Sequence, residues 1–435
     1  MIKSKFYLFS FLIFFLFFCN LFFGWGFQIF TIGSIPINYI ILIVLFFFIN
    51  IKVSFDILSH NKINNILFLF LLLNLMRLIY DFQKHGFIAI RDATYVIDVF
   101  FLVISAYFFS FREMYDKLNK FLKACFLTAI FYIIFWFFKD LVIIFSPIVT
   151  SPLGQEANLF FNWSTMAFFL LWFSFYKIIF SQKKRNFINI FYLVFFILFS
   201  LIIFQRRFIY LGLISLFLIS IFFKKDQTLK ISVYFFLALL VLPILNYIGI
   251  SLEGKLGKVS NMFFFIDHLA SAIPGYQGID GKFQVTSNTA EQRLEFWTYV
   301  LKTQLSNYNT LIFGNGFGSP IVNFTAIGNI TVREPHNMYL TIFSRSGLIG
   351  FYLFILINLK LINIWFQLYS ILKFKKNELH YRLLIFSGIY FVLIYVSGLV
   401  DSNLSYNYFS IIFNILWGLI ISINFLYIAG NKKLK

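Results

Sequence analysis

The sequence predicts an all-α polytopic integral membrane protein. Hydrophobic residues make up 60% of the 435 positions and charged residues only 12%, about half the charged share of a typical soluble domain. Apolar runs of roughly 20 residues, the length that crosses the hydrocarbon core of a bilayer, recur from one end of the chain to the other. We therefore expect a single membrane domain over residues 1–435 rather than a soluble fold.

Placing one helix on each apolar run gives about twelve transmembrane segments. The first run follows Lys3 and Lys5 and has no small-residue cleavage site after it, so we expect a retained span rather than a removed signal peptide. The predicted spans lie near residues 6–24, 31–50, 63–80, 93–111, 124–146, 159–180, 188–204, 208–223, 231–250, 338–359, 383–400 and 408–429.

The basic residues predict the orientation of these spans. The formal net charge is +19, and most Lys and Arg residues fall in every second loop, counted from the N-terminus. Because cytoplasmic loops collect Lys and Arg, we expect both termini in the cytoplasm and no nucleic-acid partner. The two cysteines, Cys19 and Cys125, lie inside apolar runs and predict neither a disulfide framework nor a metal site.

One loop is far longer than the others. Residues 251–335 form a hydrophilic stretch between two predicted spans, and the predicted orientation places it on the outer, periplasmic side. Within this loop, Leu294, Trp297 and Leu301 recur at helical spacing, which predicts an amphipathic helix over residues 289–306. A glycine-rich stretch at 314–318 then ends the helical pattern.

Polar residues gather at three places on the predicted outer face. An arginine pair lies between two short spans, one arginine lies on the loop helix, and a histidine begins the span after the loop. The residues are Arg206 and Arg207; Arg293; and Arg333, His336, Asn337 and Arg345. Arginine binds phosphate through paired hydrogen bonds, and histidine can accept a hydroxyl proton. The set suits attack by a sugar hydroxyl on a diphosphate-linked glycan, although solvated side chains are the alternative for each group.

Positively charged side chains would have to stabilise the departing diphosphate, because the sequence offers no obvious metal site. No Asp-x-Asp pair occurs anywhere in the chain. Arginine would then supply the positive charge that the leaving group needs in the transition state. We therefore predict no metal and no cofactor.

The order of these motifs resembles the O-antigen ligase and O-antigen polymerase superfamily of bacterial membrane glycosyltransferases. The resemblance covers residues 188–360. Its counterparts in this chain are Arg206-Arg207, Arg293-Leu294-Glu295-Phe296-Trp297, Gly314-Asn315-Gly316-Phe317-Gly318 and the segment from His336 to Gly350. It implies a GT-C-like architecture in the bacterial inner membrane, with one large periplasmic loop.

The resemblance also implies the reaction and the roles of the residues. The enzyme would be an inverting glycosyltransferase whose donor is an undecaprenyl-diphosphate-linked glycan. His336 would be the base, Arg207 and Arg293 would hold the diphosphate, and the remaining candidates would bind substrate: Arg206, Asn337, Arg333 and Arg345. Lipid A core as acceptor makes the enzyme a ligase, and a second lipid-linked repeat makes it a polymerase.

Departures from the pattern leave alternatives open. Gln205 stands where Ser or Thr is usual, and the adjacent arginines leave the register ambiguous, with Tyr210 at the offset that favours Arg207. Arg345 replaces a residue that is often acidic in ligases, which favours a polymerase, whereas the segment from His336 favours a ligase.

A polysaccharide flippase would also have about twelve spans, but charges within many of them and two similar halves are expected there. A membrane scaffold is a further alternative.

Overall fold

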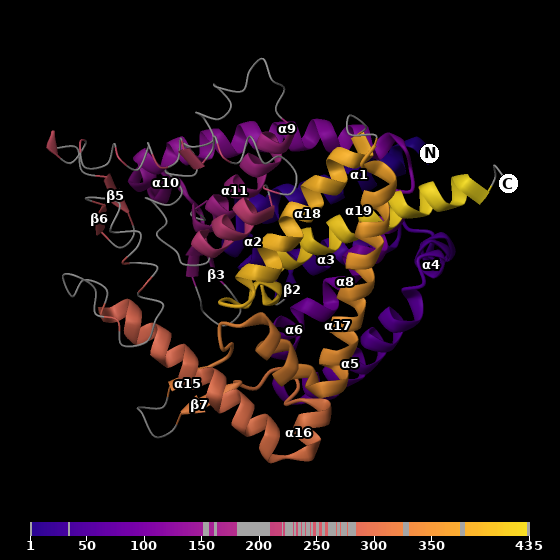
Figure 1. Ribbon diagram of the computed structural model, residues 1–435. Helices are drawn as coiled ribbons and strands as arrows, with labels where there is room; N and C mark the ends of the chain where they lie inside the picture. The colour runs from indigo at the N-terminus through magenta and orange to yellow at the C-terminus, as the bar shows by residue number, and fades with distance from the viewer. Residues whose placement is uncertain are drawn as a thin grey trace. The chain divides into compact units, whose positions relative to one another are not determined.

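The computed structural model describes residues 2–33, 35–150, 156–160, 163–180, 209–219, 284–324, 330–374 and 379–432, with isolated positions between 221 and 276. Helices dominate this part of the chain, and its short strands pair only as two-stranded antiparallel hairpins (Figure 1). The predicted all-α class is confirmed. The chain divides into two compact units.

The first unit comprises Met1–Asn162, Val300–Gly388 and Ser402–Lys435. Its helices are α1 (Ile2–Phe22), α2 (Gly24–Ile29), α3 (Ile37–Phe46), α4 (Ile51–His60), α5 (Asn64–His85), α6 (Phe87–Asp92), α7 (Thr94–Ile97), α8 (Val99–Phe108), α9 (Glu113–Ile134), α10 (Lys139–Phe145), α16 (Tyr308–Phe313), α17 (Met338–Leu372) and α19 (Asn407–Lys432), with 3-10 turns at Phe135–Phe138 and Asn403–Ser405. Its hairpins are β1 (Thr31–Ile32) with β2 (Ile35–Pro36), β3 (Ile148–Thr150) with β4 (Glu156–Asn158), and β7 (Val322–Phe324) with β8 (Ile330–Val332).

The second unit comprises Trp163–Tyr299 and Ile389–Asp401. It contains α11 (Trp163–Phe180), the hairpin of β5 (Leu252–Gly254) with β6 (Gly257–Val259), and a short apolar helix over Ile209–Ile219. Two further helices, α15 (Gln284–Ser306) and α18 (Leu379–Ser397), each contribute residues to both units. The helix predicted over 289–306 is present as α15, but Leu294 and Leu301 of its predicted apolar face are exposed.

Several helices are long and apolar enough to cross a membrane. Among the described residues there are five: Lys5–Phe22 of α1, all of α5, α17 and α18, and Asn407–Tyr427 of α19. Counting each of two sharply bent helix pairs as one span raises the number to seven. The chain is thus an all-α, multi-pass membrane-associated protein. The full count of twelve stays a prediction, because residues 188–204 and most of 231–250 lie outside the described part of the chain.

The bent pairs differ from the straight spans that the sequence predicts at 31–50 and 93–111. Helix α3 ends at Phe46, and the chain turns by 94° into α4, where the Asn50 side chain caps the new helix by accepting from Val53 N at 3.3 Å. Likewise Thr94–Phe108 turns by 120° into α9. Each break lies near the end of a predicted span, and the helix that follows it carries charged residues in its first turns, Lys52 and Asp56 in α4 and Glu113 and Asp116 in α9.

Helix α19 is the centre of the first unit, and its apolar span is 89% buried. It packs against α8 at Gly418, where a Cβ atom would lie 2.6 Å from the Leu102 carbonyl oxygen and 1.9 Å from Ser105 Oγ. The lipid supplies no hydrophobic driving force between membrane helices, so their association depends on close packing. Small residues such as glycine let the helices approach closely. Buried amides add hydrogen bonds, such as that from Asn424 to Asn61 at 2.7 Å.

Helix α17 carries the residues of greatest chemical interest. In Figure 1 its lower end lies beside α5, α6 and α16, and the contacts of α17 with α5 and α16 agree with this view. The motif residues 314–318 and 336–350, which follow α16 and begin α17, therefore lie at this end of the first unit.

Candidate active site

His336 lies immediately before α17 in an unusual backbone conformation. Its φ is +52°, in the left-handed region that few non-glycine residues adopt. The next residue, Asn337, is the N-cap of α17, and its side chain accepts a hydrogen bond from Leu340 N at 3.0 Å. The half-buried His336 side chain therefore lies directly before the capped first turn of a membrane helix.

The first turn of α17 is anchored a second time. Thr341 Oγ1 donates to the Asn337 carbonyl at 2.8 Å and lies 3.0 Å from Ser402 Oγ. Thr341 and Ser402 are both buried. These contacts fix the start of α17 to the segment that precedes α19, and they limit the freedom of the neighbouring His336.

Helix α17 is interrupted nearly two turns further along, at Gly347. Gly347 has φ +64° and ψ −170°, which no helical residue adopts. A Cβ there would lie 2.4 Å from both Gly314 N and the Ile312 carbonyl oxygen, so the break makes room for the backbone at the end of α16. Ser346 beside it donates to Asn74 Oδ1 at 2.5 Å and is hydrogen bonded to the Tyr95 hydroxyl.

Residues 314–318, the glycine turn, pack into this break. All three of its glycines have positive φ, at +78°, +77° and +97° in chain order. A Cβ on Gly316 would lie 2.2 Å from Asp81 Oδ2, and one on Gly318 would lie 2.3 Å from His85 Cβ. Glycine is required at these positions both by the backbone conformation and by the close approach of side chains.

The amide groups of the glycine turn are used within the protein. Phe317 N donates to Asp81 Oδ2 at 2.7 Å and Gly318 N to Asp92 Oδ2 at 3.0 Å. Asn315 N and Gly316 N donate to the α17 carbonyls of residues 344 and 345, at 2.7 and 3.1 Å. A phosphate-binding glycine loop needs its N–H groups directed at the ligand, so this turn serves as a connection between α5, α6 and α17 instead.

Asp92, at the end of α6, is the centre of the charges around the turn. Its side chain is 1% exposed. Its Oδ2 atom accepts from Arg333 Nη2 at 2.6 Å and lies 2.7 Å from Arg345 Nη2. Its Oδ1 atom is 3.3 Å from Arg91 Nη2. One buried carboxylate thus connects α6 to the segment before α17 and to α17 itself.

Arg345 is fully buried, with 1% exposure. Besides its ion pair with Asp92, it donates to the carbonyls of Gly316 at 3.0 Å, Ser319 at 2.6 Å and Arg333 at 3.2 Å. A buried cation is costly unless it is paired and hydrogen bonded, and only its Nε atom has no partner among the described residues. These contacts give Arg345 a structural role, and its predicted contact with substrate stays a prediction.

A second pair completes the cluster. Arg77 and Asp81 lie one turn apart on α5 and form an ion pair at 2.9 Å, and Arg77 Nη2 donates to the Asn315 carbonyl at 3.1 Å. We call Arg77, Asp81, Asp92, Arg333 and Arg345 the arginine–aspartate joint. The joint holds both ends of the glycine turn.

The structure brings together some of the predicted site residues. Arg333 and Arg345 meet at Asp92, and His336 and Asn337 follow Arg333 in the same unit. Arg293, on the part of α15 that belongs to the second unit, donates from Nη1 to the Val400 carbonyl at 3.1 Å. Arg206 and Arg207 lie outside the described residues.

Sequence reasoning missed Arg77, Asp81 and Asp92. A usable signal was present, because a charged pair at i and i+4 near the end of a predicted span is expensive in a membrane and marks a specific interaction. Their partners in the glycine turn and at Arg333 lie more than 200 positions away in the chain, which no spacing rule reveals.

The described residues offer no group of three or more His, Cys, Asp and Glu side chains that could hold a metal ion. The carboxylates of the joint are instead paired with arginines. Such an arrangement can orient a loop and present cationic groups at its edge, since Arg77, Arg91 and Arg333 each keep about a third of the side chain exposed.

Comparison with models of protein families and with curated protein sequences gives no match to this chain.

Proposed function

We propose that the protein is an O-antigen ligase-like inverting glycosyltransferase of the bacterial inner membrane. It transfers or polymerises glycan from an undecaprenyl-diphosphate-linked donor at the periplasmic face, in the synthesis of lipopolysaccharide O-antigen or capsule. The acceptor is lipid A core or a second lipid-linked repeat. Both termini lie in the cytoplasm, and residues 251–335 lie in the periplasm.

One observation carries this proposal: the order of the motifs along the chain. An arginine pair at 206–207 precedes a long hydrophilic loop with Arg293-x-x-x-Trp297, the glycine turn follows, and His336-Asn337 then opens a membrane helix interrupted at Gly347. The apolar helices on both sides of this region agree with a membrane-embedded enzyme. A soluble glycosyltransferase would need none of them.

The proposed reaction is a single displacement at the anomeric carbon of the donor sugar. The acceptor hydroxyl oxygen bonds to this carbon as the bond to the diphosphate oxygen breaks, which inverts the configuration. His336 takes the hydroxyl proton. Arg207 and Arg293 neutralise the charge that develops on the leaving diphosphate through paired hydrogen bonds. Because arginine supplies this charge, the proposed mechanism requires no metal ion.

A polymerase is the second candidate, and a specific feature favours it. Arg345 stands where ligases often have an acidic residue, and its side chain pairs with the carboxylate of Asp92. The polysaccharide banding pattern of a deletion strain separates the two activities. Lipid A core with a single repeat indicates a lost polymerase, whereas bare core with accumulated lipid-linked polymer indicates a lost ligase.

His336→Ala tests the catalytic assignment. We expect polysaccharide transfer to fall by about 10²–10⁴-fold, the usual contribution of a general base, at a normal level of protein in the membrane. Each variant is expressed in the deletion strain, its amount is checked by immunoblot, and the product is read from the banding pattern. His268→Ala is the control, because His268 belongs to the same predicted loop but to none of the motifs. Wild-type banding from His336→Ala would remove this residue from the mechanism and favour a transporter.

A further inference from the structure

A cavity of about 780 Å³ lies at the N-terminal end of α1, within the first unit. Its walls come from α1, from Phe47 and Phe48 after α3, from Tyr107 of α8 and from the residues that begin α9. Seven of its eleven lining residues are aromatic and the other four are charged. This composition suits a ligand with both an apolar part and a charged part.

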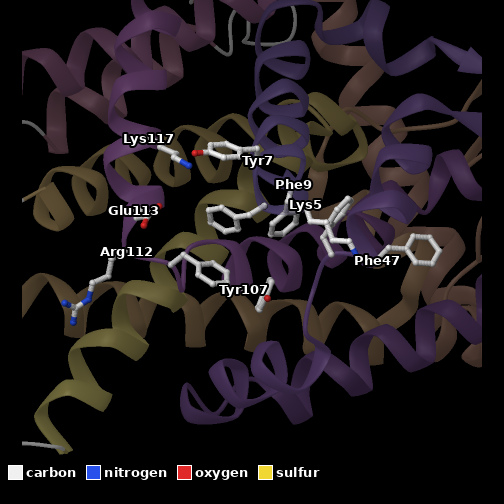
Figure 2. Close-up of a pocket in the computed structure, with 11 residues that line it drawn as sticks. Lys5, Tyr7, Phe9, Phe47, Tyr107, Arg112, Glu113 and Lys117 are labelled. Atoms are coloured by element: carbon white, nitrogen blue, oxygen red, sulfur yellow. The ribbon is translucent and has the colours of Figure 1, made fainter. Parts of the chain in front are cut away.

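The charges in the cavity favour an anion. Lys5, Arg112 and Lys117 contribute three positive charges, and Glu113 offsets one of them. Lys117 Nζ lies 5.2 Å from the ring centroids of both Phe6 and Tyr7, which holds the ammonium group against the aromatic wall. Figure 2 shows Lys5 and Lys117 on opposite sides of the aromatic side chains, while the Arg112 guanidinium is directed away from them.

The cavity also lies at a membrane boundary. One of its lining residues is Lys5, where the apolar span of α1 begins. Tyr7 and Phe47 are 64% and 84% exposed at this end, as expected for aromatic side chains that meet lipid at the level of the head groups. The distribution of Lys and Arg predicts that this end faces the cytoplasm, where anionic lipids are concentrated.

We propose that this cavity binds the phosphate head group of an anionic phospholipid. Lys5 and Lys117 attract the phosphate electrostatically from two sides of the cavity, and the aromatic walls receive the first methylene groups of the acyl chains. A freely diffusing phosphate would have no use for these walls. The proposal concerns the opposite end of α1 from the predicted reaction side, and it does not depend on the proposed enzymatic activity.

The test measures lipid binding to the purified full-length protein by native mass spectrometry, with phosphatidylglycerol, phosphatidylcholine and inorganic phosphate as separate probes. A lysine near an anionic head group contributes about a fivefold change in affinity, and two contribute about thirtyfold. We therefore expect phosphatidylglycerol to bind the wild type and to bind Lys5→Gln/Lys117→Gln about thirtyfold more weakly. Each single variant should lose about fivefold, and Lys5→Arg/Lys117→Arg should bind like the wild type.

The matched control is Lys120→Gln/Lys123→Gln, which removes the same charge from exposed positions on α9 that do not line the cavity. This control should retain wild-type binding. Equal losses in both double variants would show general surface attraction and overturn the proposal. Equal binding of phosphatidylcholine, or saturation by inorganic phosphate alone, would overturn it as well. Unchanged thermal unfolding of the variants without added lipid establishes that their fold is as stable as that of the wild type.

Discussion

Removing the carboxylate of Asp92 should destabilise the first unit more than any other single change in the arginine–aspartate joint. Asp92→Ala leaves Arg345 in place at 1% exposure, with its ion-pair partner gone. Arg333 is affected less, because 28% of its side chain is exposed and water can replace the lost partner. Gly318 N loses its acceptor as well.

The magnitude follows from these contacts. Leaving one charge of a buried ion pair without its partner costs about 3–5 kcal/mol, and the stranded Gly318 N–H adds about 1 kcal/mol. The expected loss is therefore about 4–6 kcal/mol. Removing both buried charges should be much less harmful, because apolar side chains can replace a buried pair at little cost. Asp92→Leu combined with Arg345→Met should be more stable than Asp92→Leu alone.

Thermal unfolding of the purified protein in detergent, followed by tryptophan fluorescence, measures these differences. Asp56→Ala, at an exposed position on α4, is the control and should stay within about 0.5 kcal/mol of the wild type. If Asp92→Ala were as stable as this control, the buried ion pair would not hold the first unit together. If the Asp92→Leu/Arg345→Met variant were less stable than Asp92→Leu, the cost could not come from the unpaired charge of Arg345.

Three further predictions concern the glycine turn, the second unit and the topology. Gly316→Ala should lower the free energy of unfolding by about 2–4 kcal/mol, because alanine is strained at positive φ and its Cβ would clash with Asp81. Gly33→Ala, with similar φ but open space around it, should show only the loss from backbone strain in the same unfolding assay. Arg293→Lys keeps the charge but not the planar fork, so glycan transfer should be clearly impaired, and full activity of Arg293→Ala would exclude this residue. A cysteine at Ser287 should react with a membrane-impermeant thiol reagent from the periplasm over a low background, since both native cysteines are buried; protection until the inner membrane is lysed would reverse the predicted orientation.

The sequence predicts helix positions well where hydropathy decides the outcome. The apolar runs at 6–24, 63–80 and 408–429 correspond to α1, α5 and α19, since burying backbone polar groups in lipid leaves a helix as the available solution. Bends are harder to predict. The turn of 94° after Phe46 joins the apolar helix α3 to the partly charged helix α4, and the cap at Asn50 marks where the second helix begins. The 35 residues of α17 also exceed the predicted 338–359, because apolar residues continue beyond the length that a bilayer needs.

The candidate site also has features that the sequence predicts and features that only the structure reveals. Motif order selects His336 and the glycine turn, but it does not distinguish a residue that contacts substrate from one that holds the backbone. Arg345 illustrates the difficulty, because a cation inside a span suggests function, whereas its contacts are with Asp92 and three backbone carbonyls. Only the fold brings Asp92, on α6, to these arginines.

The glycine turn limits how a diphosphate could be bound near His336. The four backbone N–H groups from Asn315 to Gly318 already donate to Asp81, Asp92 and two α17 carbonyls. Directing them at a ligand would remove one hydrogen bond from each of two buried carboxylates, at a cost of about 1.5–3 kcal/mol each, although both carboxylates would keep their arginine partners. A donor diphosphate near His336 must therefore be bound by side-chain cations. Around the glycine turn, the partly exposed side chains of Arg77, Arg91 and Arg333 have the access to water that Arg345 lacks. The glycines then contribute to the proposed reaction indirectly, by fixing the segment from Arg333 to His336 against α6 and α17.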